Sequence, residues 1–168
     1  MQRVHLTVGI AQLPTSSSIA VNLDRLLDSL RGSLAGDMIV TPEGSLTGYL
    51  EDDGLGELAR QTPEQVDRAL DVIAREVDRI GVHVWVGACR YAAGDWWNMA
   101  YGLSPGGERH EYRKANLATA ERELFRAGDE LPTFAVAQAT VGVQICRELR
   151  FPEQWSGWLS LEPSCSCT

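Results

Sequence analysis

The sequence has few cysteines, no excess of positive charge and no long apolar run, and each absence excludes a class of protein. Its 168 residues include 15 Lys and Arg against 23 Asp and Glu, which gives a net charge of −8. Because a phosphate backbone is bound mainly by Lys and Arg, this balance argues against nucleic acid as a partner. No apolar stretch approaches the roughly 20 residues that a membrane-spanning helix needs. We therefore expect neither a nucleic-acid-binding protein nor a membrane protein.

The four cysteines, at positions 89, 146, 165 and 167, are too few and too scattered for a disulfide framework. The close pair Cys165 and Cys167 has no second Cys or His pair at metal-ligand spacing, and the three histidines stand singly. We therefore expect no structural zinc site. A Gly-rich loop followed by Lys and Ser or Thr is also absent, which disfavours nucleotide binding.

The composition is that of one soluble globular domain, with 44% hydrophobic and 23% charged residues. The N-terminus passes directly into a strand-like pattern, without the apolar core and small-residue cleavage site of a signal peptide. We therefore expect a cytoplasmic protein.

Hydrophobic periodicity predicts strands that first alternate with helices and then pair as hairpins. Two helices are expected at 19–34 and 63–80, the second with Thr62 as its cap and Gly81 after its end. This order predicts an α/β domain whose sheet is covered by helices on one face. The expected strands, which share β-branched and alternating residues, are 4–11, 38–40, 82–89, 97–103, 108–113, 134–137 and 140–145.

The C-terminal residues differ in composition from the rest, since 156–168 are rich in Ser and Cys and have no clear periodicity. We expect a domain over 1–155 and an atypical tail over 156–168, produced by a truncation or a change of reading frame. Missing strands would leave sheet edges and apolar faces uncovered. Such a chain is expected to be poorly soluble, to aggregate or to depend on a partner chain.

Three ionisable residues follow strand-like runs: Glu43, Lys114 and Cys146. Taken singly, each has an ordinary explanation as a turn carboxylate, a surface lysine and a small buried thiol. Together, a carboxylate, an ammonium and a thiol are the groups that cysteine-dependent amide cleavage requires. Loops at strand ends are also where sites form in α/β sheets.

The segments that carry these residues resemble the motifs of the nitrilase or carbon-nitrogen hydrolase superfamily. They read PEGSLTGY at 42–49, YRKANL at 112–117 and GVQICRELRFPE at 142–153, and the resemblance extends from Val8 to Trp155. It implies an α/β fold of the αββα sandwich type. The sandwich is expected to be incomplete, because members of the superfamily continue well beyond the Phe-Pro-Glu motif with further strands and helices.

The resemblance also implies a mechanism. Glu43 takes the thiol proton, and Cys146 attacks the carbonyl carbon of a non-peptide C–N bond to form a thioester. Lys114 and the backbone N–H of Arg147 hold the oxyanion, and ammonia or an amine leaves. Water then hydrolyses the thioester, so neither a metal nor an organic cofactor is required.

A second active-site glutamate often follows the lysine in this superfamily. Glu121 matches that position best, and Glu123 is the weaker candidate. The chain departs from the common pattern at Asn116, where His is frequent, and at Glu148, where Asp is frequent. Both departures are mild and leave the implied triad intact.

Two functional readings stay open: an amidase-like hydrolase, and a truncated, non-catalytic remnant or interaction module of the same fold. A working Cys146 is expected to have a depressed pKa and to react fast with small electrophiles, whereas an inert buried thiol would favour the remnant. A serine hydrolase is disfavoured, because Ser45 stands in the wrong place for a nucleophile elbow. The expected partner is a small amide, nitrile or carbamoyl compound. Pairing of subunits, common in the superfamily, leaves a homo-oligomer open.

Overall fold

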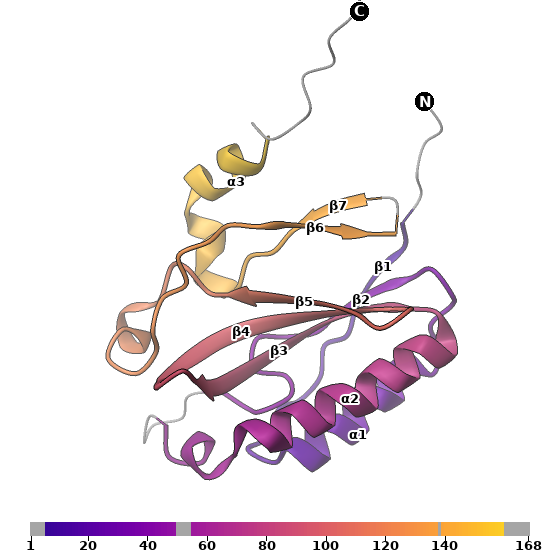
Figure 1. The fold of residues 1–168 in the computed structure, drawn as a ribbon, viewed down its shortest axis with the longest axis horizontal. Helices are drawn as coiled ribbons and strands as arrows, with labels where there is room; N and C mark the ends of the chain where they lie inside the picture. Colours follow the sequence, from indigo (N-terminus) through magenta and orange to yellow (C-terminus); the bar gives the residue numbers. More distant parts are fainter. Residues whose placement is uncertain (1–5, 50–54, 138, 160–168) are drawn as a thin grey trace, which may run out of the picture.

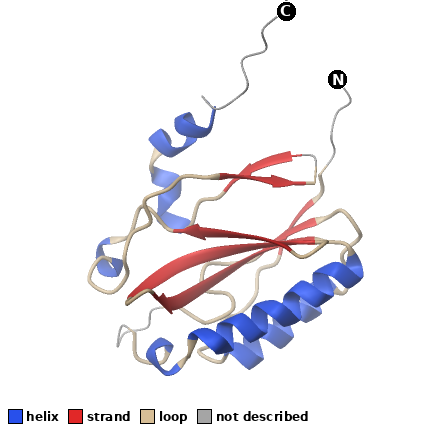
Figure 2. Ribbon diagram, in the orientation of Figure 1, coloured by secondary structure: helices blue, strands red, loops and turns tan. Residues whose placement is uncertain are grey.

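The computed structural model describes residues 6–49, 55–137 and 139–159, and these form a mixed α/β arrangement with short 3-10 turns (Figures 1 and 2). The elements follow in the order β1 Val8–Ile10, α1 Ile19–Leu30, β2 Met38–Val40, η1 Leu58–Arg60, α2 Pro63–Ile80, β3 His83–Ala92, β4 Asp95–Ser104, β5 Glu108–Arg113, η2 Thr119–Glu121, β6 Thr133–Val136, β7 Ala139–Gly142, η3 Cys146–Arg150 and α3 Pro152–Leu159. Among the described residues, none of the helices combines the length and the apolarity that crossing a membrane requires.

The larger sheet has the strand order β1-β2-β3-β4-β5. Strands β1, β2 and β3 are parallel, whereas β3, β4 and β5 are antiparallel. Parallel neighbours need a long crossover, so α1 and α2 follow the first two strands. Antiparallel neighbours can be joined tightly, and Ala93 and Gly94, both at positive φ, turn the chain directly from β3 into β4.

Helices α1 and α2 pack together on one face of this sheet (Figure 1). Buried residues of α2 recur three to four positions apart, so they form one apolar stripe toward the strands. The helix begins with Thr62, whose backbone N–H donates to Gln65 Oε1 at 2.8 Å, and ends at Gly81 with φ 81°. The core on this face includes Leu26, Leu30, Val66, Leu70, Ile73, Val77, Val84 and Val86.

The hairpin of β6 and β7 forms a separate two-stranded sheet over the opposite face (Figure 1). Trp85 lies between the layers, with its ring centroid 5.2 Å from that of Phe134. Met38, Ala100, Tyr112, Val136 and Ile145 complete this second core. The layers therefore follow the order helices, large sheet, small sheet, which confirms the α/β sandwich with only part of its second half.

Most predicted elements are confirmed, with two corrections. The first helix ends at Leu30 rather than at residue 34, because Asp37 accepts the Leu34 N–H at 2.9 Å and turns the chain toward β2. The last strand ends at Gly142 rather than at residue 145, because the Ile145 N–H donates to the Glu148 side chain instead of a neighbouring strand. Cys146 therefore begins a 3-10 turn and does not end a strand.

Positions 4 and 5 of the predicted first strand and positions 160–168 of the predicted tail lie outside the described residues. Helix α3 extends from Pro152 to Leu159 and therefore includes position 156, where the tail was expected to begin. The boundary between domain and tail, and the origin of the tail, stay predictions.

Candidate active site

The loop that carries Glu43 is fastened to β3 by hydrogen bonds. The Leu46 N–H donates to the Gly87 carbonyl at 2.9 Å, and Ser45 Oγ lies 3.2 Å from both the N–H and the carbonyl of Gly87. The chain turns through Gly44 at φ 63°, a region that glycine adopts readily. Ser45 is thus buried and bonded to backbone, which is a structural role and not that of a nucleophile.

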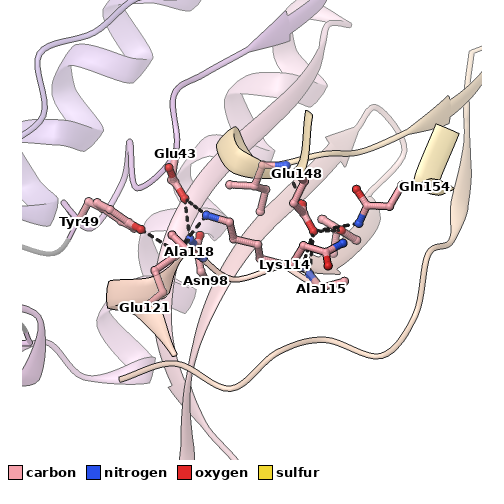
Figure 3. A network of polar contacts seen from close by, with 12 residues as sticks. Glu43, Tyr49, Asn98, Lys114, Ala115, Ala118, Glu121, Glu148 and Gln154 are labelled. Atoms are coloured by element: carbon pink, nitrogen blue, oxygen red, sulfur yellow. Dashed lines mark hydrogen bonds and ion pairs between the residues drawn. The ribbon is translucent and has the colours of Figure 1, made fainter. Parts of the chain in front are cut away.

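Lys114, the only lysine in the sequence, directly follows β5 and is 1% exposed. Its Nζ lies 2.7 Å from Glu43 Oε1 and 2.9 Å from Glu121 Oε1 (Figure 3). Burial disfavours the ammonium, but hydrogen bonds to both carboxylates outweigh this effect and raise the pKa of Lys114 above its ordinary value. The lysine is therefore held charged between two acidic side chains.

Glu121 is the last residue of η2, and its side chain is 1% exposed. Its Oε1 accepts from Tyr49 Oη at 2.6 Å, and Asn98 Nδ2 bridges the two glutamates at 2.7 Å from Glu43 and 2.8 Å from Glu121. Burial opposes the charge of Glu121, yet these donors and Lys114 lower its pKa. Glu123 is exposed, so the geometry favours Glu121 as the second glutamate.

Cys146 begins η3 at φ 51°, in the left-handed region that non-glycine residues rarely adopt. Its side chain is exposed. Desolvation of the thiol, followed by the charge and a hydrogen bond of Glu43, raises the pKa of Cys146, and Lys114 and the Arg147 N–H offset this only in part. This direction is opposite to the depressed pKa expected of a working Cys146, because desolvation and the Glu43 carboxylate together outweigh the Lys114 charge.

A cavity of about 320 Å³ has Glu43 and Cys146 in its wall. The rest of the wall is largely apolar and comes from both sheets. It includes Met38, Val40, Trp85, Ala100, Val141, Val143 and Ile145. The predicted base and nucleophile thus face one space that small molecules can enter.

Glu148 has a position that the sequence analysis did not predict. Its side chain is fully buried and accepts hydrogen bonds from the segment after Lys114 and from the residue before Cys146 (Figure 3). A charged residue two positions after the cysteine was the available signal, but only the fold shows what it contacts.

Within the described residues, no group of three or more His, Cys, Asp or Glu side chains could hold a metal ion.

The family model for carbon-nitrogen hydrolases matches residues 7–161. The chain belongs to this family. The chain is similar to an (R)-stereoselective amidase of a Pseudomonas species, with 30% identity over 136 residues, covering 80% of this chain and 48% of that protein. A glutamine-dependent NAD(+) synthetase of Thermotoga maritima is 31% identical over 163 residues, covering 93% of this chain and 28% of that enzyme.

The fold agrees with that of a solved amidase from a Nesterenkonia species. The two structures superpose with a TM-score of 0.74 at 21% identity, and the match covers 92% of this chain and 60% of the amidase. This carbon-nitrogen hydrolase chain therefore spans about half the length of the amidase relative from Pseudomonas and 60% of this structural neighbour.

Proposed function

We propose that this chain is an amidase-like hydrolase of non-peptide C–N bonds that uses Cys146 as its nucleophile. The observation that carries the proposal is the convergence of three segments far apart in sequence. Lys114 joins Glu43 and Glu121 at 2.7 and 2.9 Å, and Glu43 shares a cavity wall with Cys146. The family membership and the amidase relatives support the same reaction class.

The first step in this proposal is attack by a thiol that keeps its proton until the substrate is in place. The raised pKa of Cys146 means that the free enzyme holds a neutral thiol at pH 7. Glu43 takes this proton as the sulfur attacks the carbonyl carbon, so that the base acts on the nucleophile during the reaction.

The developing oxyanion needs donors that are fixed in advance. Lys114, held by two carboxylates, supplies a positive charge, and the backbone N–H of Arg147, which already contacts the thiol, supplies a second donor. Glu43 then returns the proton to the departing nitrogen and ammonia or an amine leaves. Water activated by Glu43 hydrolyses the thioester and releases the acid.

The apolar cavity wall favours a small amide with an uncharged acyl group over one with a carboxylate. A charged group placed against Trp85, Val141 and Val143 would lose its hydration without gaining a partner. The Nesterenkonia amidase has been solved with butyramide and with an adduct of acrylamide on its active-site cysteine. We propose small aliphatic amides of this kind as substrates here.

Cytoplasmic location and subunit pairing stay predictions.

Ammonia release from butyramide, acrylamide, acetamide and glutamine by the purified chain tests the proposal. Cys146→Ala is compared with Cys89→Ala, because Cys89 is buried and burial raises the pKa of its thiol to about 12. We expect release from the aliphatic amides that survives Cys89→Ala and disappears in Cys146→Ala. Equal release from both variants would contradict the assignment of the nucleophile. No release from the unmodified chain would favour a non-catalytic protein of the same fold.

A further inference from the structure

We propose that Glu148 is a positioning residue that holds the Lys114 segment and the Cys146 turn in one fixed relation. The inference rests on the proposed function, because it concerns the geometry of that site. Glu148 is 0% exposed and does not line the cavity, so it acts through other residues and not on the substrate.

One oxygen of Glu148 binds the lysine segment. Its Oε1 accepts from the backbone N–H groups of Ala115 at 2.8 Å and Asn116 at 2.9 Å, and from Tyr112 Oη at 2.8 Å (Figure 3). These donors stand on both sides of Lys114 in the sequence. The carboxylate therefore fixes the backbone from which the ammonium extends toward Glu43.

The other oxygen binds the cysteine turn. Its Oε2 accepts the Ile145 N–H at 2.8 Å, and the Glu148 N–H donates back to the Ile145 carbonyl at 3.1 Å. Ile145 immediately precedes Cys146, whose backbone is at φ 51°. A non-glycine residue keeps such a conformation only where its surroundings enforce it, and this reciprocal pair supplies that restraint.

Helix α3 is attached to the same carboxylate. Gln154 is 1% exposed, donates from Nε2 to Glu148 Oε1 at 3.2 Å, and accepts from Gln144 Nε2 at 2.7 Å. Gln144 also donates to the Glu148 carbonyl at 3.2 Å. The chain on both sides of Cys146 is thereby connected to one buried group.

A carboxylate suits this position because all five groups around it are donors: Tyr112 Oη, Gln154 Nε2 and the N–H groups of Ala115, Asn116 and Ile145. An amide of the same shape has one oxygen and one N–H₂ group. In Glu148→Gln, the side-chain N–H₂ group would therefore face N–H or O–H donors that now bind a carboxylate oxygen. Either the cysteine turn or the lysine segment would lose its buried acceptor.

The test is the rate at which iodoacetamide alkylates Cys146 across neutral and alkaline pH, followed by mass spectrometry of the peptide that contains this residue. This readout needs no turnover. Glu148→Gln is compared with Glu153→Gln, the same chemical change on an exposed side chain of α3. Unfolding in denaturant establishes that each variant is folded. Where the chain releases ammonia, kcat and KM are measured in parallel.

We expect folded Glu148→Gln to alkylate about tenfold more slowly, because a displaced thiol loses Glu43 as the base that assists its attack. Its pH profile should move to lower pH, because the same displacement removes the carboxylate charge that raises the pKa of Cys146. Glu153→Gln should stay within about twofold of the unmodified chain, as surface changes usually do. Glu148→Asp, which keeps the charge but is shorter, should fall between the two. In turnover, Glu148→Gln should lower kcat more than it raises KM.

A folded Glu148→Gln with the alkylation rate and pH profile of Glu153→Gln would overturn the inference. Should Glu148→Gln not fold, Glu148→Asp decides in the same way: a severalfold lower rate supports the positioning role, and an unchanged rate refutes it. If the unmodified chain released no ammonia from any amide, the proposed function would fail. The alkylation comparison would still decide what Glu148 does.

Discussion

At the scale of single residues, the site depends on one buried cation that neutralises the buried carboxylate of Glu121 and the half-buried carboxylate of Glu43. Lys114 contacts Glu43 and Glu121 through the same ammonium, and each of these carboxylates also accepts from Asn98. Removing one member of a buried charged group leaves its partners unpaired. The free-energy cost of these unpaired charges exceeds the stability that the intact group contributes. The chemistry and the stability of this part of the fold therefore depend on the same contacts.

Lys114→Met should abolish ammonia release and destabilise the chain by about 3–5 kcal/mol at pH 7, because Glu43 and Glu121 would face each other without a cation. The loss of stability should be smaller at acidic pH, where protonation relieves the repulsion. Unfolding in denaturant at pH 7 and at about pH 4 measures the difference. Lys114→Arg is the charge-conserving control, and a loss from Lys114→Met that did not change with pH would contradict this explanation.

Glu121 gives a second prediction about pH. Its pKa is lowered in the folded chain, so its ionisation stabilises the fold above the ordinary pKa of 4.5, and this contribution is lost as the pH falls through the folded-state value. Glu121→Gln should therefore cost about 1–3 kcal/mol at neutral pH and progressively less in acid. Unfolding curves against pH measure this effect. Glu123→Gln, at an exposed position, should leave the curve unchanged.

At the scale of secondary structure elements, the approach of the Glu43 loop to β3 depends on Gly87. A Cβ at Gly87 would overlap the Pro42 carbonyl oxygen and lie 2.7 Å from the Gly44 nitrogen. The loop could accommodate it only by moving away from the strand. Glu43 would then move relative to Lys114 and Cys146, which other elements hold.

Gly87→Ala should therefore lower kcat by at least about tenfold and destabilise the chain by about 1–3 kcal/mol. Gly32→Ala is the matched control, because a Cβ there meets nothing within 4 Å and its φ is not positive. Kinetics and thermal unfolding of both variants measure the two effects. Full activity in Gly87→Ala would show that the loop adapts without moving its carboxylate.

The elements that were predictable from the sequence are those whose signal is local. The α2 stripe, its Thr62 and Gly81 boundaries, and the strands β4 and β5 on either side of the turn at 105–107 depend on near neighbours in sequence. The motif resemblance predicted Glu43 and Cys146 as site residues, and both line one cavity in the structure, while their roles stay predictions. The burial of Glu148 and its five donors was not predictable, because those donors come from β5, the loop after it, the segment before η3 and α3, and only the tertiary fold brings them together.

At the scale of the whole molecule, the two layers of the fold are joined in different ways. Strands β3 and β4 are hydrogen-bonded to each other along their length and buried against α2. Among the residues that the structure describes, β6 and β7 pair as strands only with each other, and the hairpin packs on the large sheet through the core around Trp85. Elements with fewer buried contacts open at lower free energy than the rest of a domain. Because Cys146 follows β7, such an opening would displace the proposed nucleophile.

Native-state hydrogen exchange should therefore give the β6 and β7 amides a lower opening free energy than those of β3 and β4. Trp85→Ala removes the ring that packs on Phe134. It should lower the opening free energy of the β6 and β7 hairpin by about 3 kcal/mol or more, with a smaller change for β3 and β4. Ile73→Ala, in the core under the helices, should have the reverse pattern. Equal opening free energies for both sheets in all three proteins would mean that the layers unfold as one unit, and that Cys146 is as firmly placed as the centre of the large sheet.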